Sequence, residues 1–303
     1  MSFAQRLFKP EYWFRPRQVY HRLTRRGPRP ADADVITPWG LPMRVHPSED
    51  MGMVIWHLGV IDLVVCEACW RLLDPGETAL DVGANIGQMT GLLARRTGPT
   101  GEVWSFEPHP EVRAELERHV AAWRKTDLPL GHVRVHGVAL SNASGAAALF
   151  EPRTFSGNRG TASLELVSTE SGGANDAGGR SFTVPTQAFD EVFPKDRRVG
   201  VLKIDVEGHE PQVFAGALRT LRDRRIRDIV FEEHQSLPSP ASKLLTDAGY
   251  TLFSLEQAFW GPRIHSPTEA INRPHWLPPN YLATLDPARA IAKFRPGGWQ
   301  VLR

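Results

Sequence analysis

Two acidic stretches carry the residue types that could bind a charged ligand and act on it. In the first, an apolar run reaches Asp81 and then turns through Gly83, Asn85 and Gly87. A strand that passes through such a turn into a helix brings free backbone N–H groups and a positive helix end to one crevice. Glycines in the turn let a ligand approach the backbone closely. The spacing therefore predicts a nucleotide-type pocket.

Asp81 and Asn85 indicate which ligand this pocket takes. Nicotinamide-binding enzymes use the pattern GxGxxG, whereas here Asn85 replaces the middle glycine and Asp81 stands close enough to repel a pyrophosphate. S-adenosylmethionine carries a sulfonium and an ammonium and no phosphate. We therefore expect Asp81 to hold its amino-acid end, directly or through water, while Gly83 and Gly87 admit its body.

Two further positions fit the same cosubstrate. Glu107 ends an expected strand 20 residues after Gly87, where an acidic side chain accepts hydrogen bonds from both hydroxyls of a ribose. Ala139 and Leu140 follow the next expected strand, and their backbone can pair with the edge of an adenine.

The second acidic stretch, residues 203–210, is expected to supply the chemistry. It follows a strand in the middle of the sheet, and open α/β sheets bind ligands at the carboxyl ends of their strands. Methyl transfer needs nucleophile, methyl and sulfur in line, and an alcohol also needs a base for its proton. The candidates for this base are Asp205, Glu207, His209 and His234.

Lys203, Asp205 and Glu207 alternate along this stretch, so all three should face one side if the strand continues. A divalent ion that lowers the pKa of the acceptor is an alternative to a base, and Asp205, Glu207 and Glu233 could ligate it. S-adenosylmethionine is the expected cosubstrate, and a metal ion is not expected.

Alternating strands and helices must position these residues. This order predicts an α/β, Rossmann-like fold, with a mostly parallel, doubly wound sheet, helices on both faces and an antiparallel insert after the third strand. Strands are expected at 78–82, 102–107, 133–138, 201–206, 229–233 and 250–255, and a last one at 281–285.

The chain divides into four expected parts. Residues 1–50 form a basic, aromatic extension with a strand-turn-strand at 35–48, and residues 51–75 form a helical lead-in. Residues 76–258 form the core, and its insert at 141–182 is a binding loop with short strands at 146–151, 161–166 and 181–185. Residues 168–179 could equally be a disordered excursion. Residues 259–303 are Pro-rich, loop-like at 260–280, and complete the sheet.

Charge and cysteine content limit the partners and the compartment. The net charge of +2 gives no reason to expect nucleic acid, but residues 1–30 hold eight Arg and Lys against one acid. That segment either touches anionic lipid or an acidic partner, or packs on the domain. Cys66 and Cys69 are expected to be buried structural thiols in a reducing, cytoplasmic protein. The sequence gives no indication of the oligomeric state.

Taken together, the motifs resemble those of the FkbM family of S-adenosylmethionine-dependent methyltransferases, over about residues 76–255. The resemblance implies a class I methyltransferase fold and methylation of a hydroxyl on a small-molecule or glycan acceptor, such as a sugar or a secondary metabolite. It places Asp205 and Glu207 near the sulfonium and the acceptor, and His209 at a position that the family fills variably. The matching stretches are LDVGANIG at 80–87 with Thr90 after it, FEP at 106–108, ALS at 139–141, VPTQAFDE at 184–191 and KIDVEGHE at 203–210.

Two alternatives belong to other classes. A nicotinamide-dependent oxidoreductase is disfavoured by Asp81 and Asn85. A non-catalytic relative of the fold that only binds a nucleotide is disfavoured by the acids at 81, 107 and 205.

Overall fold

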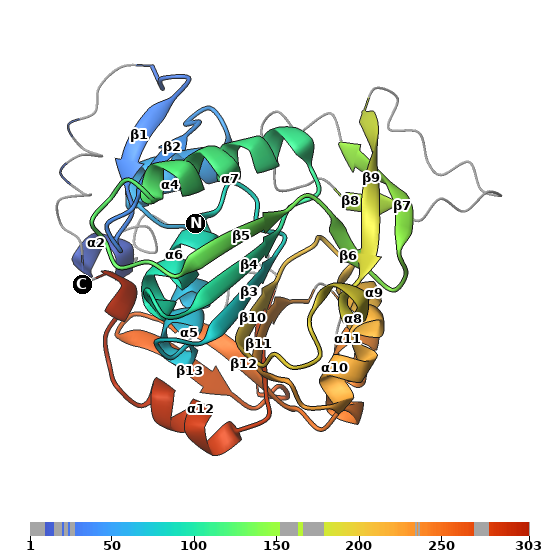
Figure 1. Cartoon of the computed structure of the whole chain (residues 1–303). Coiled ribbons are helices and arrows are strands. Elements are labelled where there is room, and N and C mark those ends of the chain that lie inside the picture. Colours follow the sequence, from blue (N-terminus) through green and yellow to red (C-terminus); the bar gives the residue numbers. More distant parts are fainter. Residues whose placement is uncertain are drawn as a thin grey trace.

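A mixed eight-stranded sheet forms the centre of the molecule (Figure 1). The computed structural model describes residues 10–14, 20, 24, 28–151, 163–165, 179–233, 235, 237–269 and 279–302. The strand order is β13-β12-β14-β11-β10-β3-β4-β5. Its strands are β3 Thr78–Val82, β4 Glu102–Phe106, β5 His132–His136, β10 Val199–Ile204, β11 Ile226–Glu232, β12 Thr251–Ala258, β13 Gly261–His265 and β14 Asn280–Thr284.

The predicted parallel sheet is confirmed. Strands β11, β10, β3, β4 and β5 are parallel, whereas β14 is antiparallel to β11 and to β12. The order reverses at β3, from which the chain moves first to β4 and β5 and then back across to β10 and β11. In open α/β sheets a ligand crevice forms at such a switch point, beyond the carboxyl ends of the strands.

Helices cover both faces of this sheet, as predicted. Successive strand residues enter opposite cores, since Ala79 lies in one hydrophobic cluster and Leu80 in the other. One face packs against α4 Asp50–Leu58, α5 Leu63–Leu72, α6 Gln88–Thr97, α7 Pro110–Trp123 and α12 Pro287–Phe294. The other face packs against α8 Phe189–Val192, α9 Glu210–Gly216, α10 Leu218–Arg222 and α11 Pro240–Asp247.

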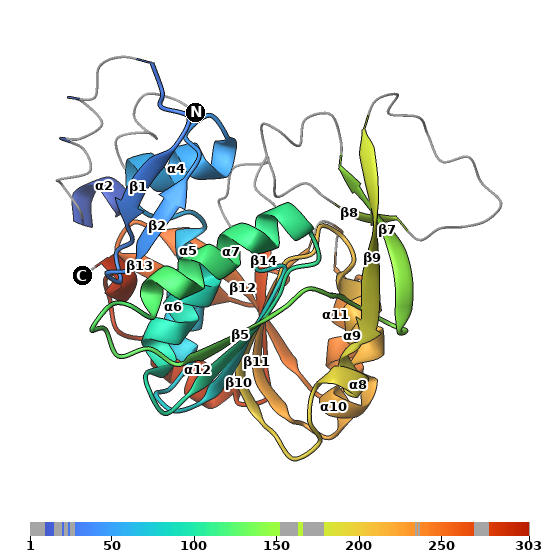
Figure 2. The same ribbon diagram turned by 45° about the horizontal axis from the view of Figure 1, so that its top comes forward.

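The insert after β5 is a separate small sheet with its own apolar cluster, in which Leu149 packs with Val184. It stands beside the helices α8–α11, and Figure 2 shows its long strand β9 rising past them. The strands, in the order β6-β9-β7-β8, are β6 Ala139–Ser141, β7 Gly145–Glu151, β8 Ser163–Glu165 and β9 Arg180–Ala188. The antiparallel insert is thus confirmed, while the expectation for residues 168–179 falls largely outside the described residues.

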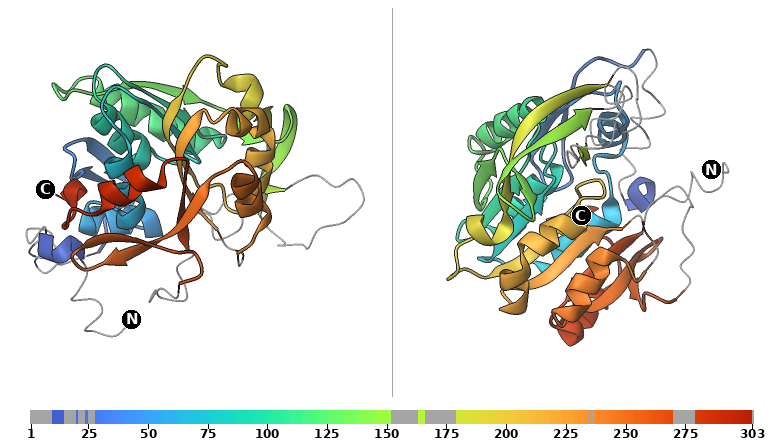
Figure 3. Two further views of the ribbon diagram at one scale, coloured as in Figure 1. Left: turned by 90° about the horizontal axis from the view of Figure 1, so that it is seen from below. Right: turned by 90° about the vertical axis from the view of Figure 1, so that its right-hand side faces the viewer.

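The C-terminal segment differs from expectation. Residues 260–280 were expected to be loop, but β13 at Gly261–His265 pairs with β12 and extends the sheet. The lead-in is helical as expected, and it consists of two helices because Gly59 ends α4 in a left-handed conformation. Figure 3 shows α12 and β13 on the side of the molecule opposite the insert. The hairpin of β1 Ala33–Ile36 and β2 Pro42–Val45 matches the predicted strand-turn-strand.

Buried polar contacts fasten the lead-in to the C-terminal segment. The CxxC pair lies on α5, where both thiols are unpaired and buried as predicted, and burial raises the pKa of Cys66 and Cys69. Between them, Glu67 accepts hydrogen bonds from Arg71 and from the backbone N–H of Val301.

Within the described residues no single helix is long and apolar enough to cross a membrane; only α4 and α5 together reach that length, with a 69° bend between them.

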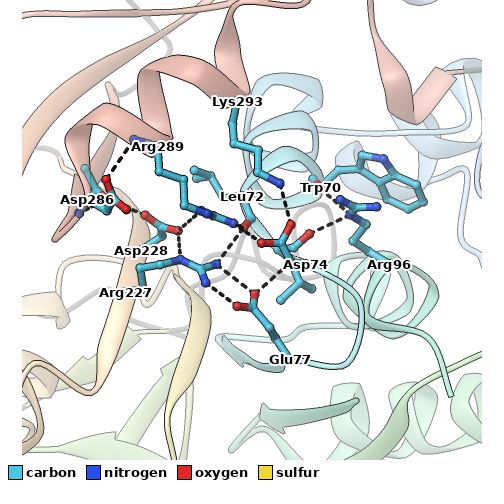
Figure 4. A network of polar contacts seen from close by, with 12 residues as sticks. Trp70, Leu72, Asp74, Glu77, Arg96, Arg227, Asp228, Asp286, Arg289 and Lys293 are labelled. Carbon is cyan, nitrogen blue, oxygen red and sulfur yellow. Dashed lines mark hydrogen bonds and ion pairs between the residues drawn. The ribbon is translucent and has the colours of Figure 1, made fainter. Parts of the chain in front are cut away.

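The amino ends of the central strands carry a network of paired charges (Figure 4). Arg227 donates to both carboxylate oxygens of Glu77 and, at 2.8 Å, to Asp228. Arg289 bridges Asp228 and Asp74 at 3.1 and 2.6 Å. Lys293 completes the network at 2.5 Å from Asp74. Burial would raise the pKa of Asp74, but these hydrogen bonds lower it to about 2, whereas at Asp228 burial prevails and raises the pKa.

Candidate active site

A cavity of about 300 Å³ lies at the opposite edge, beyond the carboxyl ends of β3, β4, β10 and β11. The glycine turn after β3 forms part of its wall. The lead-in contributes Met51, Val54 and Asp62, and the insert contributes Leu149 and Leu164. The cavity is therefore built from four of the five stretches that the sequence singled out, all but 184–191, and from the lead-in as well.

The two glycines of the turn serve different purposes. Gly83 has a φ of +75°, and a Cβ there would stand 1.8 Å from the carbonyl oxygen of Asp205, so only glycine lets the two loops meet. Gly87 has a φ of +96°, and a Cβ there would stand 2.4 Å from Leu116 of α7. Gly83 lines the cavity as expected, whereas Gly87 allows two helices to pack and is not part of the cavity wall.

Asp81 and Thr90 lie beneath the cavity rather than in its wall. Asp81 is fully buried, and its Oδ2 accepts a hydrogen bond of 2.6 Å from Thr90. Its Oδ1 lies 3.7 Å from the ammonium of Lys203, which donates to the carbonyl oxygen of Gly83 at 3.0 Å. Burial raises the pKa of Asp81, while Lys203 opposes that rise. The carboxylate thus fixes the lysine and the turn, and Lys203 stands between it and the cavity.

Glu107 lies in the wall, directly after β4. Its two oxygens accept hydrogen bonds from the backbone N–H groups of Asn85, at 2.8 Å, and His109, at 2.9 Å. Burial raises the pKa of Glu107 to about 7 in spite of these donors. The side chain of Asn85 turns back onto the N–H of Ile86 at 2.7 Å, so the residue holds its left-handed turn and its backbone faces Glu107.

Ala139 and Leu140 are in the wall at the start of the insert, where the adenine was expected. Both are buried in strand β6. Ser141 follows them, and its hydroxyl lies 2.9 Å from Nε2 of His209. This contact joins the insert to the loop that carries Asp205.

Lys203, Asp205 and Glu207 all line the cavity. The strand does not continue as the alternation required, because β10 ends at Ile204 and Glu207 has a φ of +54°. Oδ2 of Asp205 lies 3.6 Å from Nζ of Lys203. Burial alone would lower the pKa of Lys203, but the carboxylates around it raise the pKa instead. Glu207 lies at the mouth, where partial burial and the neighbouring Asp205 and Glu210 raise its pKa to about 7.

Three further predicted residues, all candidates for the base or for a metal ligand, do not reach the cavity or cannot be placed. His209 is buried against Ser141, does not line the cavity, and burial lowers its pKa. Glu233 points away, since it accepts hydrogen bonds from the N–H of Gln235 at 2.8 Å and from the hydroxyl of Ser239. His234 lies outside the described residues.

The alternative metal set of Asp205, Glu207 and Glu233 is therefore not assembled. In the part of the chain that the structure describes, no three His, Cys, Asp or Glu side chains are arranged to hold a metal ion.

Sequence reasoning missed Asp62. It named Glu232 only as one of three residues, 232–234, at a strand end that could converge on the same crevice, and gave it no role of its own. Asp62 has a φ of +51° between α4 and α5, and burial and Asp205 raise its pKa to about 6. The loop before it is fastened by Gln88, whose amide bonds both the N–H and the carbonyl of Ile61, at 2.9 and 3.0 Å. Glu232 ends β11, and burial, Asp205 and Asp62 raise its pKa to about 8. The two consecutive acids at 232–233 indicated a site at this strand end, but the sequence did not show which of the two side chains faces it.

The strand order, the switch-point cavity and the carboxylate at the end of β4 define a Rossmann-like, class I methyltransferase fold. The model of the methyltransferase FkbM domain matches residues 81–252, which is more than half of the chain. The chain belongs to the FkbM methyltransferase family.

Two curated relatives are 30% identical to the chain. Hexuronic acid methyltransferase AglP of Haloferax volcanii matches over 171 residues, which are 55% of this chain and 61% of that protein. 31-O-demethyl-FK506 methyltransferase FkbM of Streptomyces tacrolimicus matches over 220 residues, which are 64% of this chain and 80% of that protein. The chain thus spans less than two thirds of the first relative.

A solved FkbM methyltransferase from Methylobacillus flagellatus KT is 17% identical, with a TM-score of 0.42, and the match covers 68% of this chain and 43% of that one. A TM-score this low supports no inference about the site.

Proposed function

We propose that the protein transfers the methyl group of S-adenosylmethionine to a hydroxyl oxygen of a sugar, a glycan or a secondary metabolite. The observation that carries this proposal is the composition of the cavity. Its wall joins the turn at Gly83, the carboxylate of Glu107 and the strand of Ala139 and Leu140 at one switch point. The two curated relatives act, by name, on a hexuronic acid and on a demethylated FK506.

The residues present fit this cosubstrate. Asp62, Asp205, Glu207 and Glu232 line the cavity together with one lysine, which suits two positive charges and opposes a pyrophosphate.

Each group has a distinct expected role. S-adenosylmethionine supplies a methyl carbon activated by positive sulfur. Glu107 accepts from the ribose, and Asp205 holds the reacting end near Lys203. Asp81 and Thr90 keep the turn in place, and His209 keeps the loop of Asp205 against the insert. Asp205 and Glu207 remain candidates for the base.

Calorimetric titration with S-adenosylmethionine, S-adenosylhomocysteine and NADH tests the proposal. We expect micromolar binding of the first two and none of NADH, followed by transfer of labelled methyl to members of a glycan and natural-product panel. Membership of the FkbM family argues against the oxidoreductase. Binding of NADH alone would overturn the proposal, and absence of all binding would favour a non-catalytic relative.

Three further expectations belong to this proposal. We propose a cytoplasmic setting, which the two unpaired and buried cysteines support. We propose that no metal is needed, so that activity survives complete chelation. The contact of residues 1–30 with anionic lipid or an acidic partner stays a prediction, since most of that segment lies outside the described residues.

A further inference from the structure

The last residue of β11, Glu232, occupies a place in the cavity that none of the predicted bases occupies. Strands β10 and β11 are in parallel register up to the pair Ile204 and Phe231. One residue further along each strand come Asp205 and Glu232, so these two acids leave the sheet side by side, about 5 Å apart in backbone. Both line the cavity.

The antiparallel neighbour brings a polar partner to the same place. Asn280 is the register partner of Glu232 on β14, and it also lines the cavity. A carboxylate and an amide therefore flank one point of the wall, beyond the strand that carries Asp205. This arrangement suits a hydroxyl, which donates to the carboxylate and accepts from the amide.

Adjacent Glu233 shows that the position is specific. Side chains of successive strand residues point to opposite sides. Glu233 is accordingly directed to the turn before α11, where the N–H of Gln235 and the hydroxyl of Ser239 occupy its two oxygens. Only one of the two consecutive glutamates faces the cavity.

Glu232 is also suited to accept a proton. Lys203 lies 3.6 Å from Asp205 and forms an ion pair with it. Glu232 instead faces Asp205, Asp62 and Glu207, and burial together with these charges raises its pKa to about 8, with Lys203 opposing. A base is most effective when its pKa lies near the working pH.

We propose that Glu232 is the catalytic base that removes the proton from the acceptor hydroxyl. This proposal rests on the proposed function. The acceptor oxygen forms a bond to the methyl carbon, the carbon–sulfur bond breaks, and its electron pair stays on sulfur. The hydroxyl proton passes to the carboxylate of Glu232 and then to solvent. The products are a methyl ether and S-adenosylhomocysteine.

A binding experiment tests the position of Glu232 without a known acceptor. Sinefungin resembles S-adenosylmethionine but carries an amino-bearing carbon in place of the methylsulfonium, so it places an ammonium where the methyl would be. We expect wild-type protein to bind sinefungin at least about tenfold more tightly than S-adenosylhomocysteine, on the scale of a charge-assisted hydrogen bond. Glu232→Gln should abolish most of this preference and leave the affinity for S-adenosylhomocysteine unchanged.

Glu117→Gln is the matched control, because Glu117 is exposed on α7 and pairs only loosely with Arg113, at 3.5 Å. It should keep the full preference for sinefungin. Glu232→Asp retains the charge, so it should keep part of the preference for sinefungin that Glu232→Gln loses. Thermal melting checks that each variant folds.

Turnover supplies the second readout. With any acceptor from the panel, Glu232→Gln should lower kcat about 10²- to 10⁴-fold without changing KM for S-adenosylmethionine. The loss of kcat should be smaller with an acceptor that carries an acidic, phenolic hydroxyl. An unchanged preference for sinefungin in Glu232→Gln, or kcat within twofold of wild type, would overturn the proposal. Failure of the proposed function is distinguishable, because wild-type protein would then bind none of these ligands.

Discussion

Charged side chains are arranged in opposite ways at the two ends of the central strands. At the amino ends, the carboxylates of Asp74, Glu77 and Asp228 meet an equal number of basic groups, from Arg227, Arg289 and Lys293. At the carboxyl ends, within the residues that the structure describes, six carboxylates line the cavity with one lysine and no arginine. Charge is neutralised where the sheet is fastened and left unbalanced where a cationic ligand is expected.

Removing a paired charge at the fastened end should have the largest effect. Arg227→Ala leaves Glu77 without its arginine, and it leaves the fully buried Asp228 with Arg289 as its one basic partner beside the hydroxyl of Thr284. We expect the free energy of unfolding to fall by about 3 kcal/mol, as when one partner of a buried pair is removed. Urea denaturation measures this, with exposed Arg222→Ala as the control. Equal, small losses in both variants would show that the network does not stabilise the fold.

Asp205→Ala should act on turnover rather than on stability. We expect at least about a hundredfold loss of kcat, because the reacting end of the cosubstrate loses its charged neighbour. The dissociation constant for S-adenosylhomocysteine should change far less. Parallel kinetics and calorimetry decide the role, since equal losses in both would make Asp205 a cosubstrate ligand only.

Glu107→Ala should weaken binding of S-adenosylmethionine by about ten- to a hundredfold, the scale of a charge-assisted hydrogen bond. Because Glu107 also holds the N–H of Asn85, the melting temperature should be recorded with the affinity. Exposed Glu111→Gln provides the control. An unchanged dissociation constant would remove Glu107 from the ribose role.

The smallest effect concerns pH. The pKa values of Asp62, Glu207 and Glu232 are raised to about 6, 7 and 8, so the folded protein holds protons that the unfolded chain releases. This contribution to stability is present at pH 5 and is lost as the pH rises towards 8. Asp74, with its lowered pKa, acts oppositely and loses its contribution as the pH falls towards 2.

Urea denaturation at pH 5.5 and pH 8.5 tests this sign. The decline with rising pH should be smaller in Glu207→Gln combined with Glu232→Gln than in wild-type protein. Binding of the cationic cosubstrate should lower the same pKa values and release protons, which calorimetry in two buffers of different ionisation enthalpy detects. An identical pH dependence in both proteins would show that these acids do not repel one another.

Periodicity and motif order predicted most of the fold, because the strands at the centre are short, mainly apolar runs and most of them are followed by a glycine or proline turn. Strand β13 was missed, since Gly261 and Pro262 are typical of loops and only the pairing with β12 makes the segment a strand. The sequence predicted a helical lead-in but not where it divides, because the left-handed residues Gly59 and Asp62 interrupt a run that is apolar on both sides.

The site was predictable as far as chain position and acidity define it. Residue type and spacing predicted that Asp81 holds the amino-acid end of the cosubstrate, directly or through water, but the depth of its side chain could not be inferred from one strand. The structure puts Lys203 of the neighbouring strand above it. Similarly, two consecutive acids at 232 and 233 predict that one side chain faces the cavity and the other faces away. The structure shows that Glu232 lines the cavity together with Asn280, its register partner on β14.

The wall formed by Met51, Val54 and Asp62 has a consequence for recombining members of this family. These residues precede residue 81, where the family match begins, yet they enclose the same cavity as the motifs within it. A boundary drawn at the matched segment would therefore cut through the pocket. A transplant of this pocket should therefore carry residues 50–72 together with the core and the insert.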